Sequence, residues 1–257
     1  MIKSLVLVGL SLFAFQAEPS KEVRARLFKQ ILADDSELRE CLTQPQGGQA
    51  EAEQEMMVER VDLNRDGIKE YKIQLCACSL HNCGIYVYRR VGDGFESILD
   101  DAAGLGTQFL RTSSNGYRDL QINARDGAAA EVRTVYKFDG RQYREAQARI
   151  VDRETGESKP AFRRVQFKRG SSSTTVHGKV SIVLPDTYLL GARAGQIMSV
   201  QLTSAQESVR FLLLSPKSTI ADKARSWTGT LPETGDYEII VDGDKRGGAY
   251  SITISIK

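Results

Sequence analysis

A regular alternation of apolar and polar side chains over residues 188–256 constrains the fold more than any other feature of this sequence. Side chains that alternate with a period of two lie on opposite faces of a strand, and Gly and Pro between such runs mark tight turns. The pattern therefore predicts half-buried strands in a jelly-roll-like β-sandwich over residues 162–257. The apolar positions that carry this prediction are Met198, Val200, Leu202, Tyr237, Ile239, Val241, Tyr250, Ile252, Ile254 and Ile256.

The first 17 residues have the pattern of a secretory signal peptide. Lys3 supplies the positive charge, and the apolar run from Leu5 to Phe15 that follows is too short to cross a membrane. We expect cleavage near Ala17, and the first Cys, Cys41, lies too far along the chain for lipid attachment there. The mature chain is therefore expected to be soluble in the periplasm or outside the cell, with no integral membrane segment.

Composition and charge argue against two classes of protein. Hydrophobic residues make up 41% and charged residues 26% of the 257 residues, so the chain is not expected to be disordered. Residues 161–257 hold 13 Lys and Arg against 8 Asp and Glu, and residues 1–160 hold 22 against 25. This asymmetry is mild, whereas a nucleic-acid-binding protein needs a clustered basic face with interleaved aromatic residues. No nucleic-acid partner is expected.

Residues 18–150 are predicted to form a disulfide-bonded α+β domain. Ser20 is suited to cap a helix whose apolar side chains recur at helical spacing from Val23 to Ile31. A second short helix is expected after Asp35, and residues 44–54, rich in Gly and Gln, are predicted to be a loop. Residues 57–150 read as short strands separated by turn signals, which predicts an antiparallel meander covered on one side by the helix.

Residues 151–161 are predicted to be a linker between this domain and the sandwich. Asp152 to Lys159 is rich in charge and is followed by Pro160, a composition typical of domain boundaries.

A stretch that begins at Asp62 has the spacing of a calcium-binding loop. Oxygen-bearing side chains occupy positions 1, 3 and 5, and position 6 is the Gly that a tight loop requires. Position 12 is Ile73, so the bidentate Glu of an EF-hand is missing, and strands are expected to flank the loop. The alternative is a hairpin turn whose polar side chains bond the backbone. The candidate residues for a structural calcium ion are Asp62, Asn64, Asp66, Ile68 and Glu70.

Four cysteines in a secreted chain predict two disulfides, for which three pairings exist. We favour Cys78 with Cys83, closing a hairpin, and Cys41 with Cys76, joining helix to sheet. A zinc site that uses His81 is the alternative, and it is disfavoured because thiolate ligands must stay reduced to bind the metal.

The sequence offers no support for catalysis. Neither His81 nor His177 has a nucleophile motif beside it, which predicts a protein that is not an enzyme. Hydrolase activity is the least favoured hypothesis.

Arg193 and Trp227 are candidate contacts for a partner. Arg193 either recognises a partner or covers the sandwich edge with its charged head in water. Trp227 either packs against the core and the Pro232 turn or stacks on a sugar. The sugar interpretation makes an envelope accessory or carbohydrate-binding module the alternative function.

The residues from Phe167 onward resemble a known group of bacterial domains. They resemble the pre-peptidase C-terminal type of β-sandwich and, within it, the periplasmic inhibitors of goose-type and invertebrate-type lysozyme. The resemblance covers the predicted sandwich, and its Ala-x-Ala-Gly-Gln and Leu-Pro-x-x-Gly-x-Tyr elements are more specific for the fold than for one partner. The stretches that carry it are Phe167 to Ser172, Val176 to Gly178, Tyr188 to Gln196, Trp227 to Pro232 and Thr234 to Tyr237.

The resemblance implies a binding function for the turn before Tyr237. In those inhibitors a Ser-Gly-x-Tyr loop is thought to enter the lysozyme cleft, and this chain has Thr234-Gly235-Asp236-Tyr237. Hydroxyl and carboxylate groups on a protruding loop can hydrogen-bond the catalytic carboxylates of a glycosidase. Alternatively, Gly-x-Tyr is the ordinary turn of the whole sandwich group, with Tyr237 pointing inward.

The N-terminal half resembles uncharacterised secreted bacterial modules with an Asp-x-Asn-x-Asp-Gly-x-x-Glu loop, a likeness that implies no activity. Together these features predict a secreted, non-enzymatic binding protein of the bacterial envelope. The most concrete version is a lysozyme inhibitor that acts through the loop from Thr234 to Tyr237.

Overall fold

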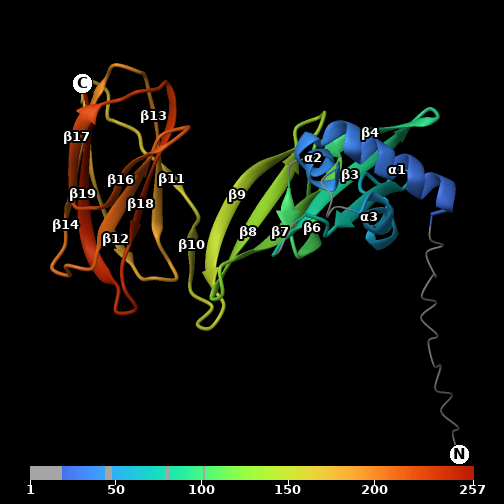
Figure 1. The fold of residues 1–257 in the computed structure, drawn as a ribbon, viewed down its shortest axis with the longest axis horizontal. Helices are drawn as coiled ribbons and strands as arrows, with labels where there is room; N and C mark the ends of the chain where they lie inside the picture. The colour runs from blue at the N-terminus through green and yellow to red at the C-terminus, as the bar shows by residue number, and fades with distance from the viewer. Residues whose placement is uncertain (1–18, 44–47, 79–80, 101) are drawn as a thin grey trace, which may run out of the picture. The chain divides into compact units, whose positions relative to one another are not determined.

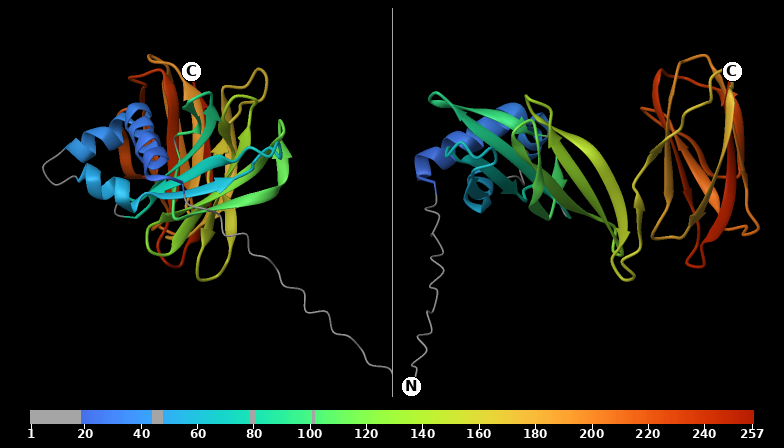
Figure 2. Two further views of the ribbon diagram at one scale, coloured as in Figure 1. Left: turned by 90° about the vertical axis from the view of Figure 1, so that its right-hand side faces the viewer. Right: turned by 180° about the vertical axis from the view of Figure 1, so that it is seen from behind.

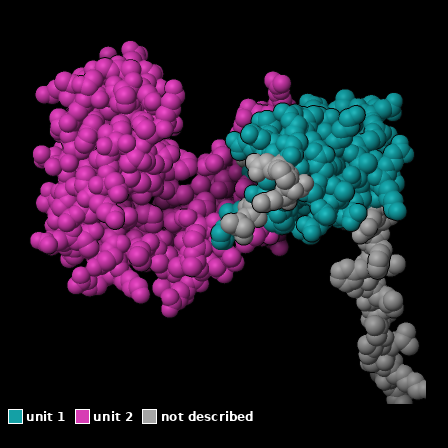
Figure 3. All heavy atoms as spheres, viewed as in Figure 1, with its two compact units in different colours: residues 1–102 teal, residues 103–257 magenta. Residues whose placement is uncertain are grey.

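The structure, a computed structural model, describes residues 19–43, 48–78, 81–100 and 102–257. The predicted signal peptide, residues 1–17, lies outside the described residues. Contacts divide the chain into two compact units, residues 1–102 and 103–257, which Figure 3 colours separately. The predicted fold class is confirmed, because the described chain is mainly β and its sheets are almost entirely antiparallel.

Helices cover one face of the sheet in the first unit (Figures 1 and 2). α1 (Lys21–Asp34) follows the predicted N-cap Ser20, whose hydroxyl oxygen accepts a 3.3 Å hydrogen bond from a backbone N–H of the first turn. α2 (Ser36–Thr43) comes next, and the Asp35 carboxylate accepts the backbone N–H of its first turn at 2.8 Å. Both predicted helices are confirmed.

The predicted loop over residues 44–54 is wrong from Gln49 onward, where α3 (Gln49–Glu55) begins. The helix consists of Ala, Glu and Gln, which are strong helix formers. Only Ala52 in it is buried, so the sequence lacks the apolar stripe that would have predicted a helix. Arg24 of α1 supports the end of this helix by donating from Nη2 to three backbone carbonyl oxygens, those of Glu53, Gln54 and Met56.

The first sheet is an antiparallel meander in chain order. It contains β1 (Met57–Val61), β2 (Glu70–Leu75), β3 (Cys83–Val91) and β4 (Gly94–Leu99). The predicted shared face of β2 lies in the core under the helices, together with two tyrosines of β3. The side chains concerned are Tyr71, Ile73, Leu75, Tyr86 and Tyr88.

Two tyrosines fasten the junction between α1 and α2 to this sheet. Tyr86 donates its hydroxyl proton to Asp35 at 2.8 Å, and Tyr88 donates to Asp34 at 2.9 Å. Burial, reinforced by the neighbouring carboxylates, raises the pKa of both phenols. Each tyrosine therefore remains a hydrogen-bond donor at neutral pH.

The chain forms two disulfides, as predicted, but the favoured pairing is wrong: Cys76 is bonded to Cys83, and Cys41 to Cys78. The reason is strand register. Leu75 lies opposite Gly84, so the next opposed positions are Cys76 and Cys83, with Cα atoms 4.1 Å apart.

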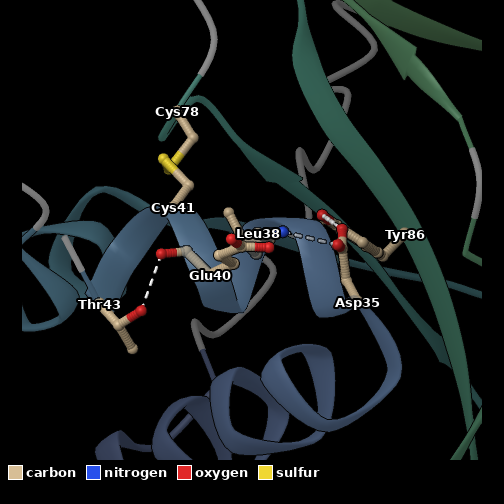
Figure 4. Close-up of a disulfide and its surroundings, with 7 residues drawn as sticks. All are labelled: Asp35, Leu38, Glu40, Cys41, Thr43, Cys78 and Tyr86. Carbon is tan, nitrogen blue, oxygen red and sulfur yellow. Dashed lines mark hydrogen bonds between the residues drawn. A yellow bond between two sulfur atoms is a disulfide. The ribbon is translucent and has the colours of Figure 1, made fainter.

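Cys78 lies in the turn after β2 and forms the other disulfide, with Cys41 of α2 (Figure 4). With these bonds formed, no thiolate is available for the alternative zinc site at His81. Two disulfides are typical of a protein in an oxidising, extracytoplasmic compartment.

A second sheet begins the second unit. It is ordered β10-β9-β8-β7-β6 and is fully antiparallel. Gly116, Gly127 and Gly140 have φ of 86°, 64° and 108° at turns that the sequence predicted. β5 (Ala103–Gly104) belongs to the first sheet. The strands of the second sheet are β6 (Gly106–Ser114), β7 (Tyr117–Asp126), β8 (Ala130–Phe138), β9 (Tyr143–Asp152) and β10 (Ser158–Pro160).

Residues 57–150 thus form two sheets instead of the one predicted meander. The turn signals are alike in both, and alternation alone does not show where one sheet stops and the next begins. The boundary between the two compact units falls after Ala102. The predicted linker, residues 151–161, lies inside the second unit and contains the end of β9, a turn and β10. The assignment of residues 18–150 and 162–257 to separate domains stays a prediction.

The predicted β-sandwich is present. One sheet is ordered β11-β13-β18-β15-β16 and the other β12-β19-β14-β17. All ten apolar positions predicted to face the core are buried. The strands are β11 (Arg163–Arg164), β12 (Ser173–Val180), β13 (Asp186–Ala192), β14 (Ile197–Thr203), β15 (Arg210–Leu214), β16 (Thr219–Ala224), β17 (Ser226–Thr230), β18 (Gly235–Asp242) and β19 (Gly248–Ile256).

A buried carboxylate ties the segment after β9 to the sandwich. Asp186, 2% exposed, lies with Oδ1 3.0 Å from Lys159 Nζ and 3.2 Å from Arg163 Nη2. Its Oδ2 accepts the Tyr250 hydroxyl at 2.6 Å, and the Tyr250 and Tyr188 hydroxyls lie 2.7 Å apart. The predicted linker is therefore anchored to the sandwich through Lys159.

Candidate partner-binding surface

Two turns lie side by side at one end of the sandwich, and they contain two of the predicted partner-binding residues, while others lie in the strands that flank them. The turn between β13 and β14 contains Arg193, and the turn between β17 and β18 contains Thr234. The Ala194 N–H donates to the Thr234 hydroxyl oxygen at 3.0 Å. Two backbone bonds, from Gly195 N to Leu231 O and from Leu231 N to Gln196 O, join the same turns. The two turns therefore form one connected surface.

Tyr237 lies beneath this surface instead of on it. Its side chain is 0% exposed, so it cannot contact a partner as the resemblance implied, and the inward alternative applies. The phenol oxygen donates to Glu233 O at 2.8 Å and accepts from Glu233 N at 3.1 Å. Tyr237 is thus a positioning residue that holds the turn to the core.

Asp236 is exposed, but it is held by an arginine. Arg164 of β11 donates from Nη1 and Nη2 to the two carboxylate oxygens at 2.8 and 2.7 Å. Hydrogen bonding from Arg164, and then the attraction of its charge, lowers the pKa of Asp236. Because both side chains are half exposed, the pair fixes orientation more than it contributes stability.

Gly235, which lies between Thr234 and Asp236 in the sequence, packs closely against the neighbouring turn. A Cβ added to Gly235 would lie 2.6 Å from the ring carbon Cγ of Pro216, which belongs to the neighbouring turn between β15 and β16. The glycine therefore allows the two turns to approach, and a larger residue would push the Thr234–Asp236 segment outward.

The remaining candidates lie in different environments. Arg193 is exposed, and its backbone N–H donates to Gln196 Oε1 at 2.7 Å, which leaves the guanidinium in solvent. Trp227 is half-buried and packs against the sandwich core, with its ring over Gly229 of the same strand. Its position on the core side supports the packing interpretation over sugar stacking.

We name the exposed side chains of Arg164, Arg193, Thr234 and Asp236 the turn surface. Sequence reasoning missed Arg164, because 72 positions separate it from Asp236. The parallel pairing of β11 with β13, which brings the two together, leaves no signal in a two-residue strand. The basic dipeptide Arg163-Arg164 is the only sequence hint in that strand.

The predicted calcium loop adopts a compact turn in which its side chains bond the backbone. Asp62 accepts the N–H groups of Arg65 at 2.6 Å and Gly67 at 3.0 Å, while Asp66 accepts that of Ile68 at 2.6 Å. Asn64 donates to Asp66 at 2.8 Å. These bonds match the alternative hairpin interpretation and leave calcium binding a prediction.

Glu70 is the buried member of that loop. It is 3% exposed, and its Oε2 accepts the Leu63 N–H at 2.8 Å. Burial raises its pKa, and the charges of Asp66 and Asp62 act in the same direction.

Within residues 19–43, 48–78, 81–100 and 102–257, no group of three or more His, Cys, Asp and Glu side chains is arranged to hold a metal ion. In the same ranges no helix is long and apolar enough to span a membrane.

Comparison with known proteins gives only structural likenesses. No family model matches the chain, and no curated protein does. A periplasmic inhibitor of g-type lysozyme from Aeromonas hydrophila is 28% identical, with a TM-score of 0.34 over 37% of this chain and 96% of the inhibitor.

Two further solved structures are similar over a comparable share. A g-type lysozyme inhibitor from Salmonella Typhimurium is 26% identical, with a TM-score of 0.32 over 38% of this chain and 100% of the inhibitor. The pre-peptidase C-terminal domain of a Bacillus anthracis collagenase is 15% identical, with a TM-score of 0.29 over 37% of this chain and 94% of that domain.

Proposed function

We propose that this protein is a secreted, non-enzymatic binding protein that recognises a protein partner through the turn surface. The observation that carries the proposal is the bonded pair of turns, in which Thr234 accepts the Ala194 N–H while Asp236 is held by Arg164. Exposed polar groups that are already fixed in place lose little conformational entropy when a partner binds.

The proposed partner is a goose-type or invertebrate-type lysozyme. The choice rests on the resemblance of the Ala192-Arg193-Ala194-Gly195-Gln196 and Leu231-to-Tyr237 elements to those of lysozyme inhibitors. A glycosidase cleft carries paired carboxylates. An arginine donates to carboxylates in a bidentate manner, so Arg193 is the member of the turn surface best suited to meet them.

No observation favours the alternative of a carbohydrate-binding module that uses Trp227. The indole ring packs on the core side of β17, where Trp227 lies opposite the buried Val200.

Calorimetric titration of a goose-type lysozyme and an invertebrate-type lysozyme with the mature protein tests the proposal. Wild type is expected to bind at least one of them, and the Arg193→Ala and Asp236→Ala variants to bind at least about tenfold more weakly. Lys168→Ala is the matched control, because Lys168 is an exposed cation of the same unit outside the turn surface. If wild type and the three variants bind with equal affinity, the turn surface is not part of the binding site.

A further inference from the structure

One face of the second sheet carries basic side chains in opposed pairs. Arg133 of β8 lies opposite Arg149 of β9, and Lys137 lies opposite Arg144. Directly opposed residues of an antiparallel pair share a face, and so do residues four apart along one strand. All four therefore lie on one face, which we name the cationic face.

The four side chains are accessible to solvent. The Arg133 and Arg144 side chains are 47% and 66% exposed, Lys137 is exposed and Arg149 is partly exposed. Glu131 pairs with Arg133, and Asp139 Oδ2 lies 3.5 Å from Arg144 Nε. These acidic neighbours orient the arginines without covering them.

Attraction between the opposed side chains does not account for this arrangement, although Arg133 and Arg144 have acidic neighbours and Arg149 Nη2 donates to the Ser158 carbonyl and hydroxyl oxygens at 2.9 Å. Like charges placed directly opposite each other on neighbouring strands destabilise a sheet. Residues 103–160, which contain this sheet, hold 10 Lys and Arg against 8 Asp and Glu, so the overall excess of basic charge there is small. Two opposed basic pairs gathered on one accessible face are suited to a ligand of negative charge.

The rest of the face narrows the class of ligand. Gln121 and Gln147 flank Val135 in the rung between the two basic pairs, and Asn123 lies beside Arg133. Amide side chains both donate and accept hydrogen bonds, as sugar hydroxyls require. The positions between the two basic pairs are Gln121, Val135 and Gln147, so no aromatic ring is placed there for the base stacking that single-stranded nucleic acids use.

We propose that the cationic face binds a linear polysaccharide that carries carboxylate or sulfate groups. The two basic pairs lie four residues apart along β8, about 13 Å at the rise of a strand, so one chain can bridge both. Guanidinium groups pair with carboxylate and sulfate oxygens, while the amides between them bond the hydroxyls. This site is separate from the turn surface and does not depend on the proposed function.

Binding to polygalacturonate, which carries carboxylates and no sulfates, and to dextran sulfate, which carries sulfates and no carboxylates, tests the inference and separates the two kinds of recognition. Neutral dextran and double-stranded DNA are the comparison ligands. The key variants are Arg133→Gln/Arg149→Gln, Lys137→Gln/Arg144→Gln and the combined quadruple substitution. Lys168→Gln/Arg169→Gln removes two exposed charges elsewhere in the same unit and is the matched control.

Wild type is expected to bind at least one acidic polysaccharide and not dextran. Each double variant should weaken binding at least about tenfold, while the control changes it less than about twofold. The variants should unfold close to the wild-type temperature, because relief of like-charge repulsion offsets the loss of exposed ion pairs and hydrogen bonds. Absence of binding to both acidic probes, unchanged binding by the quadruple variant, or equally tight binding of DNA would overturn the inference.

Discussion

The hydroxyl of Tyr237 bonds both backbone polar groups of Glu233, donating to its carbonyl at 2.8 Å and accepting its N–H at 3.1 Å. The ring of Tyr237 is fully buried in the sandwich core. One side chain thereby connects the core to the turn that presents Thr234 and Asp236. Tyr237 therefore holds in place the turn on which the proposed binding residues lie.

Replacing Tyr237 by Phe tests this role. Tyr237→Phe keeps the ring in the core and removes both hydrogen bonds to Glu233, so we expect the free energy of unfolding to fall by about 1–2 kcal/mol. Urea denaturation measures this change. Tyr237→Ala is expected to cost about 3–5 kcal/mol through the cavity that it leaves. A Phe variant as stable as wild type would show that the hydroxyl does not hold the turn.

Asp186 is expected to be the most sensitive charged residue of the second unit. Asp186→Asn keeps an acceptor for Tyr250 but removes the counter-charge of Lys159 and Arg163, so we expect a loss of about 3 kcal/mol. Thermal or urea unfolding measures it. Asp236→Asn is the control, because its ion pair is half exposed and should change stability by less than about 1 kcal/mol. Equal effects of the two substitutions would contradict the buried anchor.

The two disulfides should differ in what they contribute to stability. Cys41–Cys78 joins positions 37 apart and Cys76–Cys83 positions 7 apart. Loop-closure entropy then predicts losses of about 4 and about 2.5 kcal/mol for the corresponding double Cys→Ser variants. Urea unfolding of the two variants checks the order. Peptide mapping without reduction checks the pairing, and a peptide that links Cys78 to Cys83 would refute it.

The Arg164–Asp236 pair predicts a pH dependence with a definite sign. The hydrogen bonds from Arg164 lower the pKa of Asp236 in the folded protein, so the stabilisation is present above the ordinary aspartate pKa of about 3.9 and is lost as pH falls through the lowered value. Carbon-13 NMR titration should place the wild-type pKa below this value and return it toward about 3.9 in Arg164→Gln. An identical pKa in both proteins would mean that the pair does not persist in solution.

Local patterns in the sequence predicted much of the fold. Helix α1 was recognisable because Ser20 precedes an apolar series, and the sandwich strands because Met198 to Leu202 and Tyr250 to Ile256 alternate. α3 was missed because only Ala52 in it is buried. The boundary between the first two sheets was missed because strand pairing is a long-range property.

Only those parts of the candidate site that depend on local sequence patterns could be predicted. Thr234, Asp236 and Arg193 were recognisable as candidates in turn motifs rich in Gly and Pro, but the sequence assigned Arg193 to a different hypothesis and did not predict that its turn bonds to the turn of Thr234. The burial of Tyr237 and the pairing of Arg164 with Asp236 depend on contacts between distant segments. The disulfide pairing could have been inferred by continuing the register of β2 and β3 to Cys76 and Cys83.

Inhibition of purified goose-type, invertebrate-type and chicken-type lysozymes by the mature protein tests the central claim most directly. We predict inhibition of the goose-type or the invertebrate-type enzyme, a loss of at least about tenfold in potency for Arg193→Ala/Asp236→Ala, and no loss for Lys168→Ala. A protein that inhibits none of the three enzymes, or a double variant that inhibits as well as wild type, would contradict the proposal that the turn surface is a lysozyme-binding site.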